Sequence, residues 1–255
     1  MRRFVIAIIA GTVGLILVGC GAFDHTQKIE KVYTYHIEPN AHSAVTPVPR
    51  SEEWCMPRHQ AVIDRVRQGD VDLIFIGDSI THIWEFEGKE VWQQYYGHRK
   101  AVNMGFSGDQ TQHVLWRLNN GEIAGISPKL AIIMIGTNNS NGNLNSAKEI
   151  GEGIIAICQK LRKELPDTKI LILGIFPRGE TPSAQREKNA EASELASSIA
   201  DNKRIYYLNI NDKFLQKDGM LSKDIMPDLL HLGAKGYQIE AEAIEPTVKK
   251  LMHKK

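Results

Sequence analysis

The sequence lacks an excess of charge of either sign. Its 255 residues carry 31 Lys and Arg against 30 Asp and Glu, which gives a formal net charge of +1 at pH 7. No basic stripe stands out along the chain, so the electrostatic footprint of a nucleic-acid-binding protein is missing. Hydrophobic residues at 42% and charged residues at 24% are ordinary for a globular domain. We therefore expect no nucleic-acid partner.

Cysteine is also scarce, and sequence motifs that bind metals are absent. The three cysteines are Cys20, Cys55 and Cys158, and the nine histidines include no HExxH pair. Without a CxxC motif or a Cys/His cluster, the sequence predicts neither a metal nor another cofactor. Cys158 falls on the apolar stripe of an expected helix, which favours a buried free thiol over a disulfide.

What the sequence does contain begins with an apolar leader. Two arginines precede an uncharged apolar run over 4–18, and small residues surround Cys20. The tetrapeptide LVGC, which ends at Cys20, resembles a bacterial lipobox, in which the cysteine is lipidated and becomes the mature N-terminus. We therefore expect a protein of the cell envelope that is anchored to a membrane through lipid on Cys20.

Two alternatives stay open for this leader. Residues 4–23 are just long enough to span a membrane as an uncleaved anchor, and an ordinary cleaved signal peptide is the other option. All three interpretations place the rest of the chain outside the cytoplasm. The lipoprotein interpretation divides the chain into a signal peptide over 1–19, a linker over 20–50 and one domain over 51–255.

Beyond the linker, apolar runs of strand length alternate with longer helical patterns. The strand candidates are nearly continuous in Ile, Leu and Val, as expected for strands covered on both faces. This alternation predicts an α/β domain with a parallel sheet flanked by helices. The five expected strands are 72–76, 100–104, 130–135, 169–175 and 204–209, and the expected helices are 56–68, 110–119, 147–165, 184–200 and 234–252.

A serine follows the first expected strand, in the segment GDS at 77–79. A serine at this point, at the start of a helix, exposes its hydroxyl at the edge of the sheet where functional groups collect. Helix N-caps also favour serine, so Ser79 alone is a weak signal.

Two polar turns follow the next two strands. The segment GFSGD at 105–109 comes within one residue of the GxSxG nucleophile elbow, but the chain has no true GxSxG, which weighs against an α/β-hydrolase. The segment GTNN at 136–139 also suits a simple turn, because Asn tolerates left-handed backbone.

Near the C-terminus, Asp228 precedes His231 by three residues. Such a pair can meet on one side of a turn, where the carboxylate fixes the tautomer of the imidazole through a hydrogen bond to Nδ1–H. A lone pair of this spacing is weak as a signal. Its occurrence after a Ser block, a Gly turn and an Asn turn, in that order, is improbable as coincidence.

These four blocks resemble the SGNH (GDSL-like) hydrolase family, which is named after the Ser, Gly, Asn and His of such blocks. The segments HVLWRLNNGE at 113–122, GTNN at 136–139 and GIFPRGE at 174–180 are also similar to the catalytic subunits of the intracellular platelet-activating-factor acetylhydrolases. The similarity extends over 54–251. It implies a flavodoxin-like SGNH hydrolase fold, in which helices flank a five-stranded parallel sheet.

The resemblance also implies catalytic roles for the residues of these blocks. Ser79 would be the nucleophile, His231 the general base and then acid, and Asp228 the residue that orients His231. The oxyanion hole would comprise the backbone N–H of Ser79, the backbone N–H of Gly108 and the side-chain amide of Asn138. Adjacent bases and pre-aimed donors are what a serine nucleophile needs for ester hydrolysis.

Two further positions matter for the acyl group. In the relatives, bulky residues beside the serine and the histidine keep the acyl pocket small, and Ile80 and Leu230 occupy the matching places. The resemblance therefore implies a preference for acetyl and other short acyl groups, since extra methylenes clash in a filled pocket. The alternative is that both are simply core residues.

Aromatic and basic residues near these blocks leave two interpretations open. Four aromatic residues could line a sugar-binding surface, although a helix rich in aromatics is more typical of a core. They are Trp84, Trp92, Tyr95 and Tyr96. For Arg117 and Arg178, salt bridges are as good an explanation as substrate contacts.

We therefore expect a serine esterase that hydrolyses short-chain esters, first of all O-acetyl groups on carbohydrate. The substrate would be a small-molecule or glycan ester. One alternative keeps the chemistry and changes the substrate to a short-acyl phospholipid or lysophospholipid. Another is a surface glycan-binding module that has lost catalysis. The relatives form dimers, which makes a homodimer possible here, but the sequence shows no sign of an interface.

Overall fold

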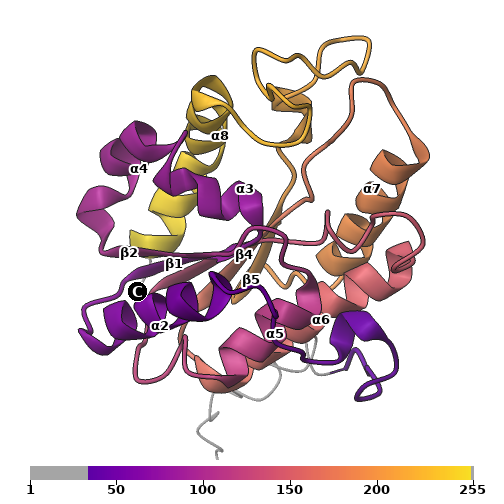
Figure 1. Ribbon diagram of the computed structural model, residues 1–255. Helices are drawn as coiled ribbons and strands as arrows, with labels where there is room; N and C mark the ends of the chain where they lie inside the picture. The colour runs from indigo at the N-terminus through magenta and orange to yellow at the C-terminus, as the bar shows by residue number, and fades with distance from the viewer. Residues whose placement is uncertain (1–33, 254–255) are drawn as a thin grey trace, which may run out of the picture.

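Figure 1 shows the computed structural model of the protein, which describes residues 34–253. A single sheet of five parallel strands lies at its centre, in the order β2-β1-β3-β4-β5. The strands are β1 (Leu73–Gly77), β2 (Ala101–Gly105), β3 (Leu130–Met134), β4 (Lys169–Leu173) and β5 (Ile205–Leu208). Cys20 and the expected signal peptide lie outside the described residues.

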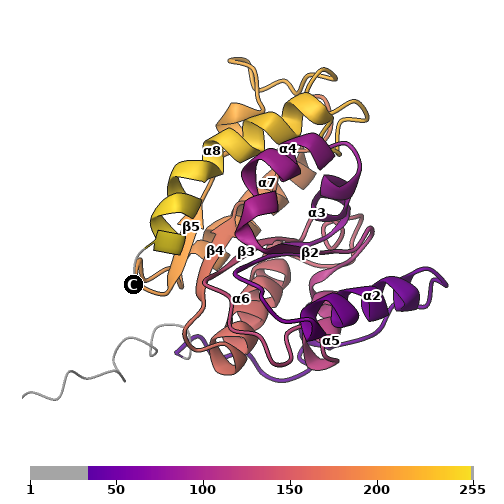
Figure 2. The same cartoon turned by 90° about the vertical axis from the view of Figure 1, so that its left-hand side faces the viewer.

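Helices cover both faces of the sheet (Figure 2). Because successive strand residues point to opposite faces, Leu73 and Phe75 join one buried cluster, while Ile74 and Ile76 join the other. One face packs against α2 (Cys55–Arg67), α5 (Thr111–Asn119), α6 (Ala147–Glu164) and α7 (Ala184–Ser197). The other packs against α4 (Lys89–Tyr95) and α8 (Ala234–His253).

The α/β class and the parallel sheet that the sequence predicts are confirmed. Cys158 is a buried free thiol, as predicted, and Cys55 is buried and free as well. Over residues 34–253, no helix is long and apolar enough to cross a membrane, and no cluster of His, Cys, Asp or Glu is suited to a metal ion.

Two short helices lie outside the five expected helix ranges, α3 (Ser79–His82) and α4. The aromatic residues in and before α4 belong to the core beneath α8. Trp84 is 1% exposed and Tyr96 is 0% exposed, and Trp92 and Tyr95 pack against the same cluster. A sugar-binding surface built on Trp84 and Tyr96 is therefore wrong, and the core interpretation is correct.

Residues 34–50, which belong to the expected linker, pack against the helical layer of α5 and α6. Ala44 and Val45 in the short helix η1 (Ser43–Val45) are buried. The Thr111 hydroxyl donates to the Ala44 carbonyl at 2.7 Å, and the Asn145 amide donates to Ser43 Oγ at 2.8 Å. The folded body thus begins before residue 51.

Candidate active site

The strand-to-helix turn after β1 places Ser79 at the carboxyl edge of the sheet. Asp78 caps α3, because its Oδ1 accepts the Ile80 N–H at 3.0 Å. Gly77 allows this tight turn, since a Cβ there would lie 2.1 Å from Thr81 Oγ1. Ser79 is the first residue of α3 and is 8% exposed.

Ser79, His231 and Asp228 form one hydrogen-bonded chain. His231 Nε2 lies 2.8 Å from Ser79 Oγ, and His231 Nδ1 lies 2.6 Å from Asp228 Oδ2. The other Asp228 oxygen accepts the backbone N–H groups of Leu230 at 3.0 Å and of His231 at 2.7 Å. The same carboxylate therefore shapes the turn and contacts the ring, which explains the three-residue spacing.

The charge on Asp228 favours a His231 ring in which Nε2 is unprotonated and can act as a base. Burial opposes the shift, but hydrogen bonds from the backbone N–H and the ring of His231 lower the pKa of the Asp228 carboxyl. An ionised carboxylate only accepts hydrogen bonds, so Nδ1 carries the proton and Nε2 presents its lone pair to the Ser79 hydroxyl. That hydroxyl donates to Nε2.

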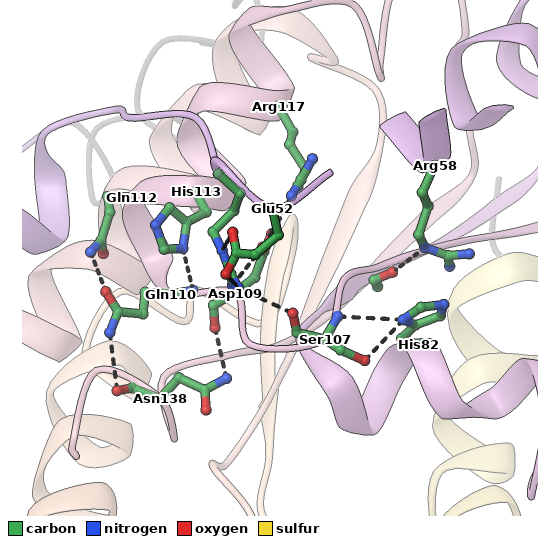
Figure 3. A network of polar contacts seen from close by, with 12 residues as sticks. Glu52, Arg58, His82, Ser107, Asp109, Gln110, Gln112, His113, Arg117 and Asn138 are labelled. Atoms are coloured by element: carbon green, nitrogen blue, oxygen red, sulfur yellow. Dashed lines mark hydrogen bonds and ion pairs between the residues drawn. The ribbon is translucent and has the colours of Figure 1, made fainter. Parts of the chain in front are cut away.

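The two polar turns lie beside each other, and Ser107 of the first turn contacts His82 at the end of α3 (Figure 3). Gly108 has a left-handed backbone with φ of 80°, which a glycine adopts freely. Asn138 donates one N–H to the Asp109 carbonyl at 2.9 Å, and an amide has a second N–H to offer. The backbone N–H of Ser79 belongs to the first turn of α3, where helical N–H groups lack intrahelical partners.

A family model, described as the GDSL-like Lipase/Acylhydrolase family, matches residues 75–239. The chain belongs to this family. Platelet-activating factor acetylhydrolase IB subunit alpha1 of Homo sapiens is 34% identical over 219 residues, which are 84% of this chain and 92% of the relative. The alpha2 subunit of Rattus norvegicus is 36% identical over 195 residues, 76% of this chain and 82% of the relative. The protein is therefore a carboxylic ester hydrolase.

Solved structures share the SGNH hydrolase fold. An acetylxylan esterase from Geobacillus stearothermophilus aligns with a TM-score of 0.56 at 17% identity, over 73% of this chain and 96% of that one. A carbohydrate acetylesterase from Sinorhizobium meliloti aligns with a TM-score of 0.54 at 17% identity, over 71% of this chain and 100% of that one.

A buried ion pair fixes the glycine turn of this GDSL-like acylhydrolase. Arg117 donates to both Asp109 oxygens at 2.9 and 3.1 Å, and its guanidinium lies 3.4 Å from the centroid of the Phe106 ring. Burial raises the pKa of Asp109, and the hydrogen bonds from Arg117 oppose that rise. Of the two interpretations of Arg117, a salt bridge or a substrate contact, the structure shows the salt bridge.

The two residues expected to line the acyl pocket lie in different surroundings. Ile80 is 1% exposed and belongs to the core cluster beneath α8, where the Tyr237 hydroxyl donates to its carbonyl at 2.7 Å. Leu230 is half-buried and borders a pocket of about 350 Å³ beside Asp228. Arg178 lines the same pocket and donates to Asn141 Oδ1 at 3.0 Å.

Sequence reasoning missed a pair of polar residues at this site. His82 lies one turn after Ser79 in α3, and its Nδ1 is 3.0 Å from Ser107 Oγ, beside Gly108. A single histidine on a short helix has no recurring pattern, so nothing in the sequence distinguishes it from an exposed side chain. The segment GFSGD resembles a nucleophile elbow, and that resemblance gives no sign of a contact with α3.

Proposed function

We propose that this acylhydrolase removes short acyl groups, acetyl above all, from O-acetylated carbohydrate, with Ser79, His231 and Asp228 as its catalytic triad. The observation that carries this proposal is the hydrogen-bonded chain from Ser79 Oγ through His231 to Asp228. A nucleophile with a base in hydrogen-bond contact, and the base oriented by a third group, is the arrangement that acyl transfer requires.

In the proposed mechanism, Ser79 Oγ attacks the ester carbonyl while His231 Nε2 takes the hydroxyl proton. Negative charge then develops on the former carbonyl oxygen, which accepts hydrogen bonds from the N–H groups of Ser79 and Gly108 and from the Asn138 amide. His231 returns the proton to the leaving alcohol, and an acyl–serine ester remains. Water, activated by the same imidazole, releases the acid and restores Ser79.

The acetyl preference has two supports. The sequence relatives are named as acetylhydrolases, and two solved structures of the same fold are named as an acetylxylan esterase and a carbohydrate acetylesterase. In addition, Ile80 is enclosed by core side chains directly after the nucleophile. A close-packed core does not give way to a longer chain, which favours a small acyl group.

A second substrate class is favoured by a specific observation. The platelet-activating factor acetylhydrolase subunits are 34–36% identical to this chain, whereas the carbohydrate esterases are 17% identical. An acetylated phospholipid is therefore the alternative substrate. The intact hydrogen-bonded set of Ser79, His231 and Asp228 favours both esterase proposals over a glycan-binding module without catalysis.

Acetate release tests the two substrates against each other. The full chain and its Ser79→Ala variant would be incubated with acetylated xylo-oligosaccharide and with a phospholipid that carries an acetyl ester. Faster release from the oligosaccharide supports the carbohydrate proposal, and faster release from the lipid replaces it. Equal release by Ser79→Ala on both substrates would remove the role given to Ser79.

We also propose that the enzyme is held at the cell envelope by lipid on Cys20. The support is the basic, apolar leader and the LVGC sequence that ends at Cys20. Metabolic labelling of the expressing bacterium with an alkyne-bearing fatty acid tests this proposal. Labelled wild type and unlabelled Cys20→Ala are expected, and label on both proteins contradicts lipidation at this residue.

A further inference from the structure

His82 joins helix α3 to the turn that carries Gly108 (Figure 3). Its Nδ1 lies 3.0 Å from Ser107 Oγ, and the Ser107 backbone N–H donates to the same atom at 3.4 Å. A backbone N–H can only donate, so Nδ1 is the acceptor and the proton of the imidazole sits on Nε2. The Ser107 hydroxyl then also donates to Nδ1.

These contacts connect two groups that the proposed mechanism needs at a fixed separation. His82 ends the helix that Ser79 begins, and Ser107 directly precedes Gly108. Asn103 strengthens the connection, because its amide donates to the Thr81 carbonyl at 2.8 Å and accepts the Gly105 N–H at 2.8 Å. The backbone N–H groups of Ser79 and Gly108 are thus held together by contacts between side chains and backbone.

The surroundings of His82 keep it neutral and in place. The Trp54 ring stacks on the imidazole at 5.7 Å between centroids, and the Phe86 ring meets it edge-on at 5.6 Å. Burial first, and then the Arg58 guanidinium, lower the pKa of His82 to about 4. Arg58 is itself paired with Glu85 at 2.9 and 2.7 Å. The acceptor at Nδ1 is therefore available at neutral pH.

We propose that His82 is a positioning residue for ester hydrolysis. It accepts two hydrogen bonds from Ser107 and so holds the Gly108 N–H at the correct distance from the Ser79 N–H for one oxyanion. This inference rests on the proposed function, because an oxyanion forms only if Ser79 attacks an ester carbonyl. His82 touches neither the substrate nor the reacting atoms.

The role predicts a specific kinetic signature. An oxyanion donor acts chiefly when charge develops in the transition state, so a displaced Gly108 N–H lowers kcat and leaves KM nearly unchanged. His82→Phe keeps an aromatic ring against Trp54 and removes the acceptor. His82→Asn restores an acceptor, since the Asn side-chain oxygen occupies the place of Nδ1.

The experiment measures p-nitrophenyl acetate hydrolysis by the full chain and its variants. For His82→Phe we expect kcat to fall about 20-fold, less than the loss of a whole oxyanion donor, with KM within about twofold. His82→Asn should recover most of kcat. Affinity for a boronic acid, which forms a tetrahedral adduct on Ser79, should fall in parallel with kcat. His98→Phe, the same change at an exposed histidine, should leave kcat unchanged.

A second variant keeps the proposal testable if His82→Phe folds poorly. Ser107→Ala alone removes one of the two hydrogen bonds and should lower kcat by a few-fold with KM nearly unchanged. Where His82→Phe folds, Ser107→Ala should have little further effect in that background, because the effects of coupled residues are not additive. Wild-type kcat in His82→Phe or in Ser107→Ala, equal losses in the Phe and Asn variants, or additive effects of the two substitutions would each overturn the proposal. If Ser79→Ala is fully active, the proposed function fails first.

Discussion

At the scale of single residues, a substitution of Asp228 can distinguish its role in catalysis from its role in the local turn. In Asp228→Asn, the side-chain oxygen can still accept the N–H groups of Leu230 and His231, so the turn persists. The amide N–H₂ cannot accept the proton of His231 Nδ1, and the imidazole is held in the wrong tautomer. We expect kcat to fall by roughly 10³–10⁴ with an unchanged melting temperature.

Steady-state hydrolysis of p-nitrophenyl acetate and thermal unfolding check this expectation. Asp224→Asn is the matched control, because Asp224 is an exposed aspartate in the same loop. An Asp228→Asn variant within about tenfold of wild type would mean that another group orients His231.

Glu240 is a buried carboxyl that should make stability depend on pH. Burial raises its pKa from 4.5 to about 8, although the Trp84 indole N–H partly stabilises the charged form. In the folded state Glu240 thus keeps a proton that it releases when the protein unfolds. The stability linked to this proton is therefore fully present at low pH and is lost progressively as the pH rises from about 4.5 through 8. The free energy of unfolding should fall by at most a few kcal/mol over that range.

Urea unfolding at several values between pH 5 and pH 9 measures the effect. Glu240→Gln removes the titrating group and should flatten the profile, so the variant gains on the wild type as pH rises. Glu242→Gln, a change of an exposed neighbour on α8, should keep the wild-type slope. Parallel profiles for all three proteins would contradict a raised pKa at Glu240.

The residues brought together at the site differ in how far the sequence could predict them. Ser79, Asp228 and His231 belong to motifs that the sequence shows directly. The position of Ser79 after an apolar strand also predicts that its hydroxyl lies at the functional edge of the sheet. The contact between His82 and Ser107 depends instead on how α3 sits on β2. The same holds for Ile80, because a bulky residue after the serine fits a pocket wall and a core equally well until its neighbours are known.

At the level of elements, the close approach of α3 to β2 depends on a glycine. A Cβ at Gly105 would lie 2.3 Å from the His82 backbone N and 2.6 Å from the Thr81 carbonyl carbon. Backbone atoms cannot swing aside, so Gly105→Ala should displace α3 and with it Ser79. We expect a loss of about 3 kcal/mol or more in stability and a loss of esterase activity.

Urea unfolding and ester hydrolysis of Gly105→Ala provide the test. Gly97→Ala is a suitable control, because an added Cβ there meets only the flexible end of the Gln93 side chain. Wild-type stability and activity in Gly105→Ala would show that α3 can retreat without consequence for Ser79.

The bounds of the strands were predicted closely, and the bounds of the short helices were not. Each expected strand overlaps its observed counterpart, because a buried parallel strand is a continuous apolar run bounded by turn residues. Helices α3 and α4 have four and seven residues, which is too short for a stripe with a period of 3.6 residues to emerge. Ser79, the proposed nucleophile, therefore lies on a helix that hydrophobic periodicity could not reveal.

For the molecule as a whole, the segment over 34–50 was the feature that the sequence misplaced. It has no periodicity and carries Pro, Ser, Thr and His, which is typical of a linker. Its attachment depends on a few specific contacts, among them the His42 ring 2.8 Å from Glu152 Oε2 and the Thr111 hydroxyl on the Ala44 carbonyl. Arg50 also donates to the Ser107 carbonyl at 3.4 Å, which ties this segment to the glycine turn.

Removal of this segment should therefore destabilise the whole domain. A protein that begins at residue 49 keeps Arg50 but loses the buried side chains of Ala44 and Val45 and the partners of Thr111 and Asn145. Apolar burial and hydrogen bonds of this number correspond to about 3–6 kcal/mol. This shorter protein should unfold at a lower urea concentration than a protein that begins at residue 34. Its kcat at low temperature should change little, because the residues of the proposed triad are untouched. If the two proteins unfold at the same urea concentration, residues 34–48 contribute nothing to stability and the linker interpretation would extend to them.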